Sequence, residues 1–315
     1  MYLDGLLQQL CNSGVGCYIG KVYVGALAYA DDVALLAPTA SAMRRLLKIC
    51  EEYGAEFSVT FNASKSAWMY ITKHGRPLSS DVQFCVDGKY ITYVMQYSHL
   101  GHVISADMND KQDILNRRNA VCGKLNNLLC HFWKCDPFVK SKLLRNFCCD
   151  FYGSCLWDLS HSSIADLTVA WRKGLRRLWG LPYRTHSVLL APLCGMLPLE
   201  SELMCRSVNF MCKCLGSCNE VVSFAARNGI FVQRMTSPIG RNAQWCCDNV
   251  GVSLYNIHSI SRDLIMQCVY SSLPDWVVTS VNMIYELLLV RWNRMCLQLL
   301  NSYELDCIVE AVCTG

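Results

Sequence analysis

The chain has 315 residues, of which 52% are hydrophobic and 17% charged, and its net charge is +4. This composition excludes an extended disordered chain and permits a sizeable core divided over two or three compact units. No apolar run is long enough to span a membrane, and the start lacks the features of a signal peptide. We interpret most of the 21 cysteines as buried thiols in a reducing intracellular compartment, cytoplasm or nucleus.

The first forty residues combine one helical pattern with several strand patterns. Leucines recur on one face of residues 2–12, which predicts a short helix. Alternating apolar residues predict strands over 15–19 and 22–26, broken at Gly20-Lys21. Residues 27–37 are apolar apart from Tyr29 and two adjacent aspartates, which predicts a buried hairpin with acids at its turn.

A second helix and more strands are expected before residue 100. Ser41 is a plausible N-cap for a helix over 42–53, which Gly54 would end. Apolar alternation then predicts a strand over 57–61. A hairpin is expected over 82–94, with Asp87-Gly88 as its turn.

From about residue 111 the pattern becomes helical, and the proline-rich stretch 182–200 is the best candidate for a boundary. Between Lys111 and Arg184 there are thirteen Lys and Arg but five Asp and Glu. This local surplus of positive charge predicts contact with a polyanion.

The adjacent carboxylates of Asp31 and Asp32 need a physical explanation. Burying unpaired carboxylates is costly, and neighbouring ones raise each other's pKa. They are tolerated at a solvent-facing turn or around a cation, and Mg²⁺ prefers such oxygen ligands. An ordinary polar β-turn is the alternative interpretation, since Asp is common in turns.

The stretch Val24-Gly25-Ala26-Leu27-Ala28-Tyr29-Ala30-Asp31-Asp32-Val33-Ala34-Leu35-Leu36-Ala37-Pro38 resembles the polymerase hairpin of LINE-type (non-LTR) retrotransposon reverse transcriptases. The resemblance implies that Asp31 and Asp32 are catalytic residues and Mg²⁺ ligands. It places Tyr29 beside the primer end and the dNTP.

Two further motifs follow in the order that this family shows. Phe61-Asn62-Ala63-Ser64-Lys65-Ser66 resembles the next polymerase motif, which implies substrate binding by Asn62 and Lys65. Tyr97-Ser98-His99-Leu100-Gly101 resembles the tight turn that grips the primer, formed here by Leu100 and Gly101. Taken alone, Lys65 could be an ordinary surface lysine.

The basic helical segment resembles the thumb of these enzymes. The resemblance and the charge together predict nucleic-acid binding by Arg117, Arg118, Lys124, Arg172, Lys173, Arg176 and Arg177. The alternative is an amphipathic helix from Trp171 to Trp179, with both tryptophans in the core and the arginines solvated.

The expected fold class is α+β. A partial reverse-transcriptase palm of antiparallel hairpins and helices (1–104) precedes a basic helical thumb-like region (105–190) and a helical C-terminal region (191–315). The implied function is RNA-directed DNA polymerase, with RNA template, DNA primer and dNTP as partners. We expect this chain alone to be inactive, because the family's other catalytic aspartate and its fingers precede the hairpin. Among the residues before Asp31 the sole acid is Asp4, on the expected first helix.

Two other functions stay open. One is a non-catalytic nucleic-acid-binding module built on the basic segment. The other is a helical interaction protein that uses a mixed face formed by Met283, Leu287, Val290, Arg291 and Arg294. Exposed sheet edges would also permit self-association. The cysteines near 205–218, and Cys246-Cys247 with His258, match no common zinc spacing.

Overall fold

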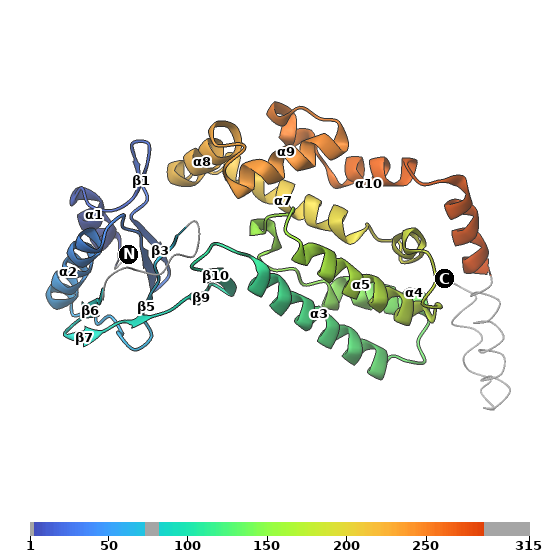
Figure 1. Ribbon diagram of the computed structural model, residues 1–315, viewed down its shortest axis with the longest axis horizontal. Coiled ribbons are helices and arrows are strands. Elements are labelled where there is room, and N and C mark those ends of the chain that lie inside the picture. The colour runs from blue at the N-terminus through green and yellow to red at the C-terminus, as the bar shows by residue number, and fades with distance from the viewer. Residues whose placement is uncertain (1–2, 73–81, 287–315) are drawn as a thin grey trace, which may run out of the picture. The chain divides into compact units, whose positions relative to one another are not determined.

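The computed structural model describes residues 3–72 and 82–286, and these combine helices with short strands (Figure 1). The predicted α+β class is therefore confirmed. The chain divides into two compact units. The first unit comprises Met1–Leu115, Tyr152–His161 and Arg206–Ser259, and the second comprises Asn116–Phe151, Ser162–Cys205 and Ile260–Gly315. Each unit combines segments far apart in sequence, so the division at residues 104 and 190 stays a prediction.

The first unit carries the strands. Its elements are α1 (Asp4–Asn12), β1 (Tyr18–Ile19), β2 (Val22–Tyr23), β3 (Ala26–Tyr29), β4 (Asp32–Leu35), α2 (Ala40–Phe57), β5 (Ala67–Trp68), β6 (Cys85–Val86), β7 (Lys89–Tyr90), β8 (Thr92–Tyr93), β9 (Gln96–His99), β10 (His102–Ser105), η2 (Ser154–Leu156), α8 (Glu220–Arg227), η4 (Asn228–Val232), α9 (Pro238–Val250) and η5 (Leu254–Ser259). The predicted helix over 2–12 is confirmed as α1.

The described residues of the second unit form helices and connecting turns and contain no strand. Its elements are α4 (Pro137–Leu143), η1 (Leu144–Cys148), α5 (Ser163–Trp179), η3 (Ser187–Leu189), α6 (Leu190–Leu193) and α10 (Arg262–Ser271). Residues 275–286 are also helical. The division between the units falls within α3 (Lys111–His131) and within α7 (Leu199–Leu215).

In the described part of the chain the strands pair two by two. β1–β2, β3–β4, β6–β7 and β9–β10 are antiparallel, and β5–β8 is parallel. The predicted turns at Gly20-Lys21 and Asp87-Gly88 are confirmed. Asp87 and Gly88 have φ of 50° and 72°, as a two-residue turn that follows the strand twist requires.

The hairpin β3–β4 was expected to be buried, and this prediction is wrong. Leu27 is 48% exposed and Tyr29 65% exposed. Within the described residues these two strands hydrogen-bond with each other and with no further strand. Among residues 3–72 and 82–286, no strand covers the outer edges of this hairpin.

Helix α2 begins at Ala40, two residues earlier than expected. Thr39, not Ser41, is the N-cap, and its Oγ1 accepts a hydrogen bond from the Ala42 backbone N–H at 3.1 Å. Both residues are good caps, so the sequence alone could not choose between them.

The same helix ends later than predicted, and residues 57–61 form no strand. Gly54 lies inside α2, where a Cβ would come 2.5 Å from the Val59 carbonyl oxygen. The glycine is needed for this close approach and does not end the helix. The helix ends at Phe57, because Ser58 adopts the left-handed conformation with φ of 56°.

The core of the hairpin region lies between helices and strands. Figure 1 shows α1 and α2 side by side, with the β1–β4 strands next to them. Their shared cluster consists of Leu6, Leu10, Leu46, Cys50 and Tyr53. The spacing of the leucines on α1 produced this buried face, as the sequence predicted.

A buried carboxylate connects distant segments of the first unit. Asp113, in the first turn of α3, is 1% exposed. Its Oδ1 accepts a hydrogen bond from the Val103 N–H at 3.1 Å, and its Oδ2 accepts one from Trp157 Nε1 at 2.7 Å. His102 Nδ1 lies 3.1 Å from Oδ2. The Trp157 carbonyl in turn accepts from Asn242 Nδ2 of α9 at 2.7 Å.

The Trp157→Phe substitution tests this network. It keeps one six-membered aromatic ring but removes one donor from a buried carboxylate and leaves a small cavity, so we expect the unfolding free energy to fall by about 1–3 kcal/mol. Chemical denaturation measures the change. Trp133→Phe is the matched control, because Trp133 is 67% exposed. Equal effects of the two substitutions would contradict the assigned role of Trp157.

The pH dependence of stability offers a second test. Burial alone would raise the pKa of Asp113, but the neighbouring His102 ring and hydrogen bonds from Trp157 and Val103 outweigh it and lower the pKa from the usual 3.8. A carboxylate with a depressed pKa stabilises the fold at pH values above its unfolded-state pKa. This stabilisation is lost as the pH falls through the folded-state pKa. The wild type should therefore lose stability below about pH 4 more steeply than Asp113→Asn. Denaturation at several pH values measures this. Exposed Asp166→Asn should follow the wild type.

Candidate functional site

The Tyr29-Ala30-Asp31-Asp32 segment is a tight hairpin turn. Tyr29 pairs with Asp32 across β3–β4, which leaves Ala30 and Asp31 as the two turn residues. Ala30 has φ of 53°, in the left-handed region that two-residue hairpin turns use. Tyr29, Asp31 and Asp32 are all exposed. The turn therefore presents two adjacent carboxylates and one aromatic ring to solvent.

These carboxylates are chemically suited to bind a hard cation. Neither side chain has a hydrogen-bond or ion-pair partner among the described residues, so both are available as ligands. No group of three His, Cys, Asp or Glu residues suited to a metal ion occurs in residues 3–72 and 82–286. Two carboxylates without a third ligand bind Mg²⁺ weakly, because Mg²⁺ gives up its water reluctantly.

Asn62 organises the turn that carries Lys65. Its Oδ1 accepts hydrogen bonds from Ser64 N at 3.0 Å, Ser64 Oγ at 2.6 Å and Lys65 N at 3.2 Å. These bonds occupy the amide oxygen of Asn62 and fix the backbone at Lys65. Lys65 is exposed, which fits both a ligand-binding lysine and an ordinary surface lysine.

Leu100 and Gly101 form the two-residue turn between β9 and β10, with φ of 49° and 76°. A left-handed conformation costs a leucine about 1–2 kcal/mol. Leu100 is 41% exposed. A Cβ on Gly101 would lie 3.4 Å from the Tyr152 ring. The strained, exposed turn is the place where the sequence predicted contact with a primer.

Several basic side chains expected to bind nucleic acid are engaged with the protein itself. Lys124 Nζ lies 3.3 Å from Asp150 Oδ2. Arg177 Nη1 donates to Asn126 Oδ1 at 2.7 Å, which joins α5 to α3. Arg117 and Arg118 are half-buried on α3.

The remaining three lie on another part of α5. Arg172 Nη2 lies 3.2 Å from Glu200 Oε1, and Arg176 donates to the backbone of Thr185. Lys173 is exposed and has no hydrogen-bond or ion-pair partner within the described residues. The nucleic-acid role of this helix stays a prediction, with Lys173 as its most available cation.

Both tryptophans of α5 are in the core, as the amphipathic alternative expected. Trp171 is 5% exposed and Trp179 is 4% exposed. Trp179 Nε1 lies 3.1 Å from Ser141 Oγ and 3.0 Å from Cys194 Sγ, which satisfies its buried donor. On a third part of the helix, Gly174 packs on α3, where a Cβ would come 2.3 Å from Leu125 Cδ2.

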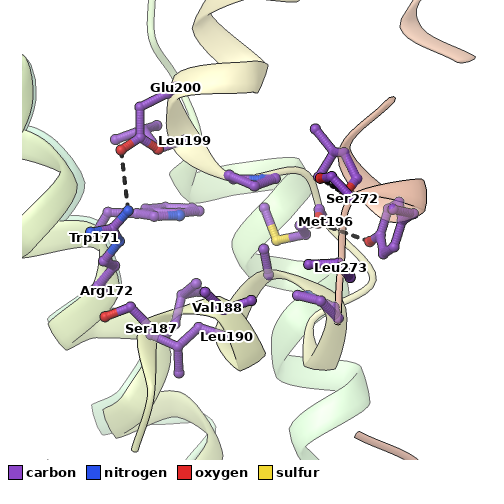
Figure 2. Close-up of a pocket in the computed structure, with 16 residues that line it drawn as sticks. Trp171, Arg172, Ser187, Val188, Leu190, Met196, Leu199, Glu200, Ser272 and Leu273 are labelled. Atoms are coloured by element: carbon purple, nitrogen blue, oxygen red, sulfur yellow. Dashed lines mark hydrogen bonds and ion pairs between the residues drawn. The ribbon is translucent and has the colours of Figure 1, made fainter. Parts of the chain in front are cut away.

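Two cavities border α5 in the second unit. One, of about 370 Å³, is mainly apolar (Figure 2). Figure 2 shows the Arg172–Glu200 ion pair at its edge. The other, of about 380 Å³, is the basic pocket, lined by Val169, Arg172, Lys173, Arg176, Tyr183, Arg184, Thr185, His186 and Ser187.

Only Arg172, Lys173 and Arg176 of the basic pocket were expected from the sequence. The other six lining residues were not: Val169 on α5, and Tyr183, Arg184, Thr185, His186 and Ser187, which follow the helix. The Gly180-Leu181-Pro182 sequence signals that the chain turns back after α5. That signal could have brought these side chains into consideration.

The described cysteines are all free thiols. Burial raises the pKa of Cys50 to about 12 and that of Cys194 to about 11. It also raises the pKa of Cys212, Cys214 and Cys247. These shifts favour the protonated thiol, which is a poor metal ligand and a poor nucleophile.

Comparisons with known proteins add no family assignment. No protein-family model matches the sequence, and a search of curated proteins finds no match. Among the helices described, none combines the length and the apolar character needed to cross a bilayer. The resemblance to reverse transcriptases therefore rests on the motifs within the chain.

The left-handed Leu100 can be tested by substitution. Asn tolerates positive φ better than other side chains do, so Leu100→Asn should raise the unfolding free energy by about 0.5–1 kcal/mol. Leu100→Ala removes the same apolar atoms without this tolerance and should give no gain. Denaturation curves compare the variants. Equal stabilities of the two variants would argue against strain at this turn.

Proposed function

We propose that this chain derives from the second half of the palm and the thumb of a non-LTR retrotransposon reverse transcriptase, an RNA-directed DNA polymerase. The observation that supports this most is the exposed hairpin that carries Asp31 and Asp32 at and beside a two-residue turn. An ordinary polar turn needs only one acidic residue, whereas two adjacent unpaired carboxylates are suited to binding a cation.

In this proposal Asp31 and Asp32 hold Mg²⁺ together with substrate phosphates. When bound, Mg²⁺ favours attack by the primer hydroxyl and neutralises charge on the phosphates. Tyr29 lies beside the primer end, and Lys65 approaches the triphosphate. Leu100 and Gly101 contact the primer backbone, and the basic helices contact the RNA–DNA hybrid.

Metal binding tests the proposal directly. In the presence of primer, RNA template and dNTP, Mn²⁺ bound by the full chain can be measured by electron paramagnetic resonance. Replacing Asp31 and Asp32 by Asn should remove most of this binding, because the metal loses both protein ligands. Asp87→Asn is the matched control, since Asp87 also lies in a two-residue hairpin turn with positive φ.

Two outcomes would count against the proposal. One is Mn²⁺ binding that is unchanged when Asp31 and Asp32 are replaced. The other is equal loss in the Asp87 control. Primer extension by this chain alone is expected to be undetectable, because the described residues supply no third acidic ligand. Robust extension would contradict that expectation.

A non-catalytic nucleic-acid-binding function is the second candidate. It is favoured by Lys173, which is exposed and has no partner among the described residues, and which lines the basic pocket together with several arginine side chains. Binding of this kind should persist when Asp31 and Asp32 are replaced by Asn. Self-association through the unpaired edges of β3–β4 is a further proposal. The helical interaction face was expected from Met283, Leu287, Val290, Arg291 and Arg294, and of these only Met283 lies within the described residues.

A further inference from the structure

The basic pocket concentrates positive charge. Arg172, Lys173, Arg176 and Arg184 line it, and no acidic side chain does. Its polar lining is completed by Tyr183, Thr185, His186 and Ser187. A concave site of this composition favours an anion, because Arg and Lys donors converge on it without a competing carboxylate in the lining.

The wall opposite α5 is held in place by backbone hydrogen bonds. Gly180 ends α5 in the left-handed conformation, with φ of 62°. The Leu181 N–H then donates to the Arg176 carbonyl at 2.8 Å. A further turn forms where the Thr185 N–H donates to the Pro182 carbonyl at 3.0 Å. The chain after α5 therefore folds back beside the helix.

Arg176 holds that returning chain against α5. Its Nε and Nη2 donate to the Thr185 carbonyl at 3.2 and 2.9 Å, and its Nη2 also lies 3.0 Å from Ser187 Oγ. A ligand would thus meet a largely preformed pocket, which reduces the entropy lost on binding.

Two of the four cations are not neutralised by the protein. Arg172 forms an ion pair with Glu200, and Arg176 donates hydrogen bonds to the Thr185 carbonyl in the pocket wall. Lys173 and Arg184 are exposed, and neither has a hydrogen-bond or ion-pair partner in the described part of the chain. They remain available to a phosphate group.

An aromatic ring stands at the same pocket. Tyr183 is 78% exposed, and Arg176 Cζ lies 6.0 Å from its ring centroid. An exposed aromatic ring supported by an arginine is a stacking platform for a nucleic-acid base. A base reaches such a ring when it is unstacked from a duplex, as in single strands.

We propose that the basic pocket binds one nucleotide of a single-stranded nucleic acid, with its phosphate on Lys173 and Arg184 and its base on Tyr183. The cavity volume of about 380 Å³ is in the range of small-ligand sites. The inference rests on the proposed function in taking nucleic acid as the partner. Its residues are separate from the hairpin of Asp31 and Asp32, so the two can be tested independently.

Fluorescence anisotropy with the full chain tests the aromatic contact. The probe is a labelled single-stranded RNA of about 12 nucleotides, within usual site sizes. Tyr183→Ala should weaken binding about tenfold, because it removes the stacking surface. Tyr183→Phe keeps the ring and should bind within about twofold of the wild type. This pair separates loss of stacking from a loss of fold.

The salt dependence of the same binding tests the phosphate contacts. Each phosphate contact contributes roughly 0.7 to the slope of log K against log salt for single strands. Replacing Lys173 and Arg184 by Ala should therefore lower the slope by about 1.4. Lys48→Ala is the control, since Lys48 is an exposed lysine of α2 that pairs with Glu52. It should leave affinity and slope unchanged.

The proposal is overturned if Tyr183→Ala binds like the wild type, or if the slope does not change in the double variant. Tighter binding of a blunt duplex of the same length would also overturn it. Its failure differs from failure of the polymerase proposal. If replacing Asp31 and Asp32 leaves Mn²⁺ binding unchanged while Tyr183→Ala loses RNA, the hairpin assignment fails and the pocket is supported. If replacing Asp31 and Asp32 abolishes Mn²⁺ binding while Tyr183→Ala binds RNA like the wild type, the pocket assignment fails and the hairpin assignment is supported.

Discussion

The organisation of the first unit depends on one buried carboxylate. Asp113 receives hydrogen bonds from the backbone of β10 and from the Trp157 indole, and it lies beside His102. A buried charge is tolerated only when donors surround it, so each of these segments must be in place for the others to be stable. Asn242 extends the connection to α9. In this way Asp113 joins β10 to Trp157, and the Trp157 backbone carries the connection on to Asn242.

The hairpin turns, in contrast, are formed by local backbone geometry. Ala30, Asp87 and Leu100 each adopt positive φ at a two-residue turn. Only Asp belongs to the residue types that tolerate this conformation well. Strained residues tend to persist where function requires the geometry. Two of these three turns, those at Ala30 and Leu100, lie in the segments that resemble the polymerase motifs.

The sequence predicted those features that depend on neighbouring residues. The leucine spacing of α1, the Gly20-Lys21 turn and the Asp87-Gly88 turn are local, and all three were correctly expected. Gly54 was misread because its role depends on Val59 returning across the helix. The exposure of β3–β4 was missed because apolar residues do not reveal whether another strand covers them. The candidate site residues divide in the same way. The turn at Asp31 is local and was expected, whereas the positions of Tyr183 and Arg184 depend on how the chain folds back after α5.

Gly174 has a consequence for the basic side chains of α5. The missing side chain lets α5 lie close to Leu125 of α3, and a residue of any greater size there would require Leu125 to move. Successive helical residues are separated by about 100° around the axis. A rotation of α5 by one position would turn Lys173 away from its present direction and bring a larger residue against α3. Gly174, the smallest residue of the helix, thus helps to determine which basic side chains α5 presents to solvent.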